Sequence, residues 1–294
     1  MYTGGVLMNN TDLIIDYDVF LNNYDFFRTS SDIPIDDFFN SLNSLINPNY
    51  NKEAMRRLSR YKEKVKNVEN DLLSEDQKEK WAYNQLTTSL RLMLAILYAD
   101  KLIIKNDTHL DKLKNGTGKV LFYPHYESYM SILPLLAAQG VKFTVLMDET
   151  MTNFWNEVLK KVSYGKNIKL YGIQNKKSII NVLHDIKQGY NLMMYPDFSV
   201  GEIPNLYTTF LSKQAYVPKG PVKIAKKLKT ELIPVCINYK EDDLLPTICL
   251  EEPINYHDSN EASLNMMKYM EKIISSDLSK WWCWEIYNDT ILKK

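Results

Sequence analysis

The sequence contains few of the residues that usually bind metals or form disulfides. Its 294 residues include only four histidines and three cysteines, and the cysteines lie far apart at positions 236, 249 and 283. They form no CxxC pair, and an odd, scattered set is typical of proteins in a reducing compartment. We therefore expect no bound metal and a cytoplasmic location.

The chain also lacks an excess of charge of either sign and lacks long apolar runs. Lys and Arg together number 36, as do Asp and Glu, so no long-range field attracts nucleic acid. The longest apolar stretches, Leu92–Ala99 and Met130–Ala138, fall short of the roughly 18–20 residues that cross a bilayer. The N-terminus has few basic residues and early acidic ones, unlike a signal peptide. We expect no nucleic-acid partner and at most peripheral membrane contact.

The first 107 residues are polar and rich in helix formers, and they show no alternating strand pattern. Ser74 and Gln77 have the spacing of a capping box, which predicts the start of a long helix. Apolar residues at spacings of three and four follow it and predict one buried face: Trp81, Leu86, Leu90, Met93, Leu94 and Leu97. We therefore predict an N-terminal helical region over residues 1–107.

Residues 108–294 alternate short apolar runs with amphipathic segments, the pattern of a mostly parallel sheet flanked by helices. The predicted strands are Val120–Pro124, Phe143–Met147, Ile168–Tyr171, Leu192–Tyr195, Leu232–Asn238 and Thr247–Leu250. The fold class is thus α/β, with one compact core over residues 108–294. Between Phe198 and Pro218 the pattern predicts a loop too long for a simple connection, which favours a functional loop or a lid.

Polar residues follow the predicted strands at the edge where open parallel sheets bind ligands. His125 and Glu127 come after the first strand, Asp148 and Glu149 after the second, and Asp197 after the fourth. A neutral imidazole can take a proton from an attacking hydroxyl or amine near pH 7. A carboxylate partner would fix its tautomer. This edge is the predicted site, with His125 as a candidate base.

Several ordered segments resemble the lysophospholipid acyltransferase superfamily, in particular its lipid A late acyltransferase branch. The first segment is HLDKLKNGTGKVLFYPHYESYM, in which an apolar strand leads to His125. The second is NVLHDIKQGYNLMMYPDFSVGEIP, which contains Asp197, and the third runs from TTFLSKQAYV to the IPV strand. The tryptophan-rich SKWWCWEIYNDTI resembles the closing segment of the branch. Together they cover roughly residues 108–290.

The resemblance implies an α/β acyltransferase that moves an acyl chain from a thioester to a hydroxyl or amine. It makes His125 the general base, and it implies no cofactor beyond acyl carrier protein or coenzyme A, whose acyl thioester is the co-substrate. The sequence lacks the membrane-anchoring N-terminal helix of the lipid A enzymes. Together with the balanced charge, this favours a small-molecule or carrier-bound acceptor in a biosynthetic pathway.

The sequence departs from the family pattern at positions that concern the site. Met130 occupies the place of the acid expected five residues after the histidine, and a thioether cannot orient imidazole. Glu127 is therefore the first candidate partner of His125, followed by Asp197.

Four further residues are expected to contact substrate. They comprise Asp197 itself, Tyr126 beside the histidine, Lys166 as the nearest basic residue to an absent arginine, and Ser212 in place of a family glycine.

Two other readings stay open at this point. A relative that lost the acid could be a non-catalytic module that binds acyl chains or carrier proteins. Alternatively, Ser199 follows a strand within Asp-Phe-Ser-Val-Gly, which resembles a hydrolase nucleophile elbow with aspartate in place of its first glycine. Four lysines between 223 and 229 predict a basic helix, either a solvated face or a surface for an acidic carrier protein or a coenzyme A phosphate.

Overall fold

The computed structural model describes residues 52–99, 107–175, 177–197, 206–239 and 245–287, together with residues 37, 40, 47 and 49. Within these ranges, six strands form one sheet in the order β3-β2-β4-β1-β7-β8. The strands are β1 (Val120–Phe122), β2 (Phe143–Met147), β3 (Ile168–Gly172), β4 (Asn191–Met194), β7 (Leu232–Asn238) and β8 (Thr247–Leu250). All neighbours are parallel except β7 and β8, so the predicted mostly parallel α/β sheet is confirmed.

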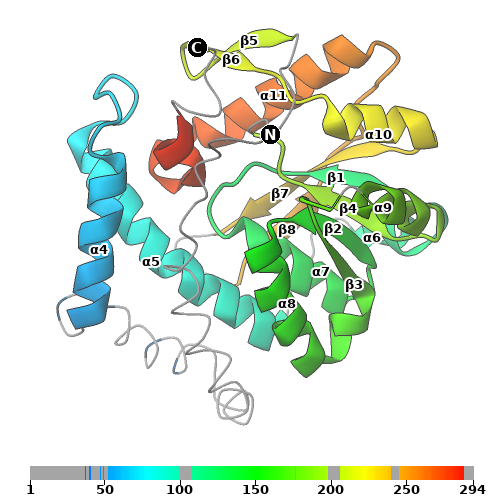
Figure 1. Cartoon of the computed structure of the whole chain (residues 1–294), viewed down its shortest axis with the longest axis horizontal. Helices are drawn as coiled ribbons and strands as arrows, with labels where there is room; N and C mark the ends of the chain where they lie inside the picture. Colours follow the sequence, from blue (N-terminus) through cyan, green and yellow to red (C-terminus); the bar gives the residue numbers. More distant parts are fainter. Residues whose placement is uncertain are drawn as a thin grey trace.

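Helices cover both faces of the sheet (Figure 1). The α-helices are α4 (Lys52–Val65), α5 (Glu75–Leu97), α6 (Asp107–Lys114), α7 (Ile132–Ala138), α8 (Glu149–Lys161), α9 (Ser178–Lys187), α10 (Gly220–Leu228) and α11 (Ser259–Ile274). Short 3₁₀ helices are η3 (Tyr129–Ser131), η4 (Ser163–Asn167), η5 (Leu278–Lys280) and η6 (Trp282–Ile286). In Figure 1, α7 and α8 lie on one side of the sheet, whereas α9, α10 and α11 lie on the other.

This arrangement makes a topological switch point between β1 and β4. The chain leaves β1 through α7 on one face, and it leaves β4 toward α10 on the opposite face. The two strands are parallel neighbours, so their carboxyl ends lie side by side while the connections that follow them go to opposite faces of the sheet. Such a switch point is where open α/β sheets bind their ligands. The edge beyond Phe122 and Met194 is thus the expected ligand-binding position.

The predicted N-terminal helical region packs onto this core. The capping box is present, since the Ser74 amide donates to Gln77 Oε1 at 3.0 Å and the Gln77 amide to Ser74 Oγ at 3.4 Å. Trp81 is buried, and its indole N–H donates to the Trp281 carbonyl at 2.6 Å. The predicted boundary at residue 107 adjoins residues 100–106, which lie outside the described ranges, so it stays a prediction.

The described part of the segment predicted as a long loop, 198–218, contains a hairpin, so the prediction of a loop without strands is corrected there, whereas its role as a functional loop or lid stays a prediction. Strands β5 (Tyr207–Phe210) and β6 (Lys213–Tyr216) pair antiparallel. The two-residue turn between them has positive φ at Leu211 (48°) and Ser212 (65°). Hairpins of this type usually carry Asn-Gly, and Leu-Ser gives no such signal. Residues 198–205, including Ser199, lie outside the described ranges.

None of the described helices is both long enough and apolar enough to serve as a membrane span.

Candidate functional site

His125 and Asp197 meet at the switch point beyond β1 and β4. His125 lies three residues after β1, and Asp197 lies three residues after β4. The His125 Nδ1 and Asp197 Oδ1 atoms are 2.5 Å apart, and the backbone N–H of His125 donates to Oδ2 at 2.7 Å. A carboxylate can only accept, so Nδ1 must carry the proton. In this tautomer Nε2 is the ring nitrogen that carries the lone pair.

Several hydrogen-bond donors surround the Asp197 side chain. It is fully buried and, besides His125, its Oδ2 accepts from the Trp281 indole N–H at 2.8 Å. The Cys283 thiol lies 3.7 Å from the same oxygen. Burial and the nearby Asp197 charge raise the pKa of Cys283 well above its usual value, so the thiol stays protonated and can donate. These donors replace the water that a buried carboxylate loses.

His125, Asp197 and Cys283 also form the one group of possible metal ligands among the described residues, with ligand atoms within 4.8 Å of one another. Histidine, carboxylate and thiolate are ligands that suit zinc. A bound thiol must be deprotonated, however, whereas Cys283 here is a buried thiol facing a carboxylate. Both oxygens of Asp197 also accept N–H groups. The hydrogen bonds therefore favour an imidazole–carboxylate pair, and the absence of a metal stays a prediction.

Aromatic rings surround the imidazole. The ring centroid of Tyr129 lies 4.8 Å from that of His125, and Tyr195 lies at 5.2 Å. Trp282 extends this wall, at 6.0 Å from Tyr129. The His125 side chain keeps 18% of its surface exposed, so the ring is not fully enclosed. An apolar wall beside a basic nitrogen suits a substrate that combines a hydroxyl with a hydrocarbon chain.

Glu127, the first candidate partner of His125, is placed elsewhere, so this ranking is wrong. Its backbone is left-handed (φ 51°), and its buried carboxylate pairs with Arg91 at 2.8 Å and Lys280 at 3.1 Å. The left-handed turn directs the side chain toward α5 and η5 and away from the imidazole. Asp197, the second candidate, is the residue that contacts the ring.

The other carboxylates considered at this edge serve local structure. Asp148 caps α8 by accepting from the Thr150 N–H at 2.8 Å, and it also accepts from Gln174 at 2.8 Å. Glu149 is the first residue of that helix and is exposed. The two acids after β2 are therefore explained by the start of α8, where acidic residues are favoured, and they need no role as partners of histidine.

The tryptophan-rich segment near the C-terminus fixes the His125 turn. The Trp282 N–H donates to the His125 carbonyl and the Glu127 N–H to the Lys280 carbonyl, each at 2.8 Å. Between these two bonds, Tyr126 forms an isolated antiparallel β-bridge with Trp281. The Tyr126 hydroxyl lies 3.1 Å from Ser276 Oγ. Burial raises the pKa of Tyr126 to about 12, so it remains a phenol. Sequence reasoning missed Trp281 and Cys283 as site residues, and the cluster of tryptophans was the available signal.

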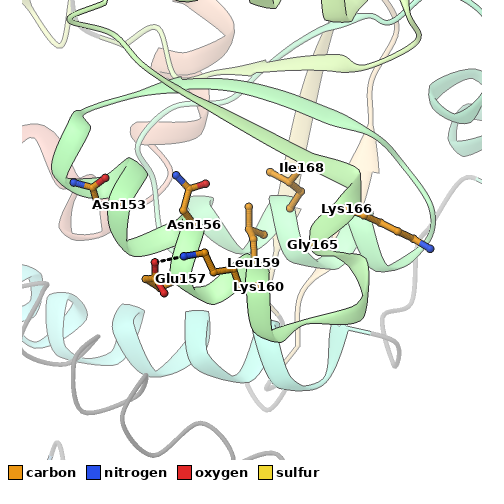
Figure 2. Close-up of a pocket in the computed structure, with 8 residues that line it drawn as sticks. All are labelled: Asn153, Asn156, Glu157, Leu159, Lys160, Gly165, Lys166 and Ile168. Atoms are coloured by element: carbon orange, nitrogen blue, oxygen red, sulfur yellow. Dashed lines mark hydrogen bonds and ion pairs between the residues drawn. The ribbon is translucent and has the colours of Figure 1, made fainter.

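The structure does not bring Lys166 to the site. Lys166 lies in η4, just before β3, and thus at the amino edge of the parallel sheet, whereas His125 lies beyond the carboxyl edge. It lines a surface pocket between η4 and α8, where its side chain points away from Asn153 and Asn156 (Figure 2). Gly165 allows η4 to pack closely on α8, because a Cβ at this position would lie 2.0 Å from the Leu159 carbonyl oxygen.

Ser212 lies in the turn between β5 and β6, and it is exposed. The neighbouring residue Phe210 packs on Trp281 with ring centroids 5.7 Å apart, and its carbonyl accepts from the Tyr287 hydroxyl at 3.0 Å. The hairpin therefore packs against the Trp281 ring through Phe210. A direct contact of Ser212 with substrate stays a prediction.

Comparison with protein families gives a match to the model described as bacterial lipid A biosynthesis acyltransferase, over residues 79–284. The matched region begins in α5, contains both His125 and Asp197, and ends at Trp284. A search among curated proteins found no match.

Proposed function

Because the chain belongs to the bacterial lipid A biosynthesis acyltransferase family, we propose that it transfers an acyl chain from a thioester to a hydroxyl or amine of a lipid acceptor. Family membership favours a lipid over the small soluble acceptor that the sequence composition suggested. The observation that carries the proposal is the His125–Asp197 contact, in which a buried carboxylate holds Nδ1 and so fixes the tautomer whose Nε2 carries the lone pair of a base.

The proposed reaction needs no covalent enzyme intermediate. Nε2 of His125 takes the proton from the acceptor as its oxygen or nitrogen attacks the thioester carbonyl. Asp197 holds the tautomer and stabilises the imidazolium that forms. When the tetrahedral intermediate collapses, the carbon–sulfur bond breaks and the imidazolium proton passes to the leaving thiolate. The products are an acylated acceptor and a free thiol, and His125 is again neutral.

The donor is proposed to be an acyl thioester of acyl carrier protein or coenzyme A, both of which carry acidic groups. The basic helix predicted at 223–229 is α10 and its C-terminal cap, where Lys223, Lys227 and Lys229 are exposed. Gly220 at the start of α10 lies near Met194 at the end of β4, because a Cβ there would be 3.7 Å from the methionine methyl group. This cationic surface therefore begins beside the site and suits an anionic donor.

Two alternative functions follow from the sequence, a non-catalytic binding module and a serine hydrolase. The non-catalytic reading was based on the missing acid at Met130, and Asp197 supplies a carboxylate at the ring from another strand. The hydrolase reading depends on Ser199, which lies outside the described residues, so it stays a prediction.

Transfer of labelled acyl chains from carrier-protein and coenzyme A thioesters to a panel of lipids tests the proposal. We expect the parent protein to transfer the label and His125→Ala to lose a hundredfold or more of the rate. His184→Ala is the matched control, because His184 is an exposed imidazole on α9. Equal rates for the parent and His125→Ala would overturn the mechanism, and failure of every acceptor to take label would overturn the activity.

A further inference from the structure

Three isoleucines are exposed in one short turn. In the described residues, five large apolar side chains are exposed, and three of them are Ile173 (49%), Ile179 (38%) and Ile180 (65%). Ile173 directly follows β3, and the other two lie in the first turn of α9. The connection between them is tight, because the Gly172 carbonyl accepts from the Ser178 hydroxyl at 2.7 Å and from the Asn175 N–H at 3.2 Å. We call residues 173–180 the β3–α9 turn.

The β3–α9 turn lies on the same edge of the sheet as the site. Strands β3, β2, β4 and β1 are parallel, so the residues after each strand all lie at the carboxyl edge. His125 follows β1, which is three positions from β3 in the sheet. At roughly 4.8 Å per strand, this separation is about 14 Å along the edge. A flat surface that met the isoleucines would thus pass close to the edge that carries His125.

The polar residues of the turn fit a charged lipid surface. Gln174, Asn175 and Lys177 are exposed between the isoleucines, and the sequence places Lys176 beside Lys177. The nearest acid with a contact to the turn, Asp148, is engaged with Gln174 and with the α8 cap. Apolar side chains that enter the acyl boundary, beside lysines that meet anionic headgroups, are the features of interfacial binding.

We propose that the β3–α9 turn inserts Ile173, Ile179 and Ile180 into an anionic lipid surface and so presents the His125 edge to its acceptor. The second half of this statement rests on the proposed function, because it takes the acceptor to be a lipid. The first half does not, since it concerns binding alone. The contact is reversible, because a few partly inserted side chains make a weak anchor.

Sedimentation of the full chain with vesicles tests the binding. The vesicles are phosphatidylcholine alone and phosphatidylcholine mixed with phosphatidylglycerol. We expect the parent to bind the mixed vesicles, and an Ile179→Ser/Ile180→Ser variant to bind about tenfold or more weakly, because several apolar carbons no longer enter the bilayer. Met55→Ser is the matched control, since Met55 is 53% exposed on α4 and should not change binding. Lys177→Glu should weaken binding to the mixed vesicles.

Three results would overturn the proposal. The parent could fail to bind either vesicle, or the double isoleucine variant could bind as well as the parent. The parent could also form a dimer that the isoleucine variant dissociates while no vesicle binding is seen, which would make the turn a protein interface. Vesicle binding needs no turnover, so it can fail or succeed whether or not the acyltransferase activity is found. Where activity is found, the isoleucine variant should lose rate on vesicle-borne acceptor and keep it on a short-chain dispersed acceptor.

Discussion

Two buried carboxylates lie near the imidazole, and they make different contacts. Asp197 lies beyond β4, and Glu127 lies in the turn after β1. Asp197 accepts N–H groups from His125 and Trp281 and faces no lysine or arginine in its described contacts. Glu127 faces two cations and no imidazole. Its left-handed backbone turns it toward α5 and η5. The direction of the turn therefore decided which acid contacts the imidazole, and closeness in sequence to His125 did not.

The largest expected effect comes from removing the imidazole itself. His125→Ala should lower acyl transfer by a hundredfold or more, as for a lost general base, because no other described side chain shares its position against Asp197. The rate with saturating thioester measures this effect. Circular dichroism should show an unchanged fold, and a folded variant with the parent rate would remove His125 from the mechanism.

Asp197→Asn should have the next largest effect. The asparagine can still accept from the Trp281 indole, but it cannot stabilise an imidazolium by charge. We expect the rate to fall by about 10–100-fold without vanishing, as for a group that orients a histidine. The split between kcat and KM separates this role from a structural one. Loss of the carboxylate should lower kcat, whereas KM for the thioester should change little, because the lost interaction acts on the base that works in the transition state.

 A folded Asp197→Asn variant with the parent rate would contradict the partnership.

Glu127→Gln should act on stability more than on rate. The change leaves Arg91 and Lys280 without their buried counter-charge, although both cations keep part of their surface in water. We expect about 1–3 kcal/mol of lost stability, less than for a fully buried pair. Denaturant unfolding measures it. A rate that falls as far as in Asp197→Asn, with stability unchanged, would restore Glu127 as the partner of histidine.

The smallest effect is expected for Cys283→Ala. The thiol is a weak donor at 3.7 Å from Asp197, so the rate should stay within about twofold of the parent. The variant also sharpens the choice between a hydrogen-bonded pair and a metal site. A large loss of rate in this variant, together with loss of parent activity on chelation, would show that His125, Asp197 and Cys283 hold a metal.

Much of the fold could be predicted because its elements are local. The strands Phe143–Met147, Leu232–Asn238 and Thr247–Leu250 occur at the predicted residues, since short apolar runs form strands wherever the fold buries them. The β5–β6 hairpin could not be predicted in this way, because Leu211 and Ser212 adopt left-handed conformations that their side chains do not favour.

The sequence by itself determined the class of fold, the family resemblance and His125 as the histidine after the first strand. Tertiary structure alone decided which acid meets that histidine, because Asp197 is 72 residues away and only strand pairing brings β4 beside β1. It also decided that Lys166 lies at the opposite edge of the sheet and that Trp281 hydrogen-bonds Asp197. The physical reason is that spacing along the chain encodes local periodicity, whereas contacts across strands depend on the order and direction in which the sheet is assembled.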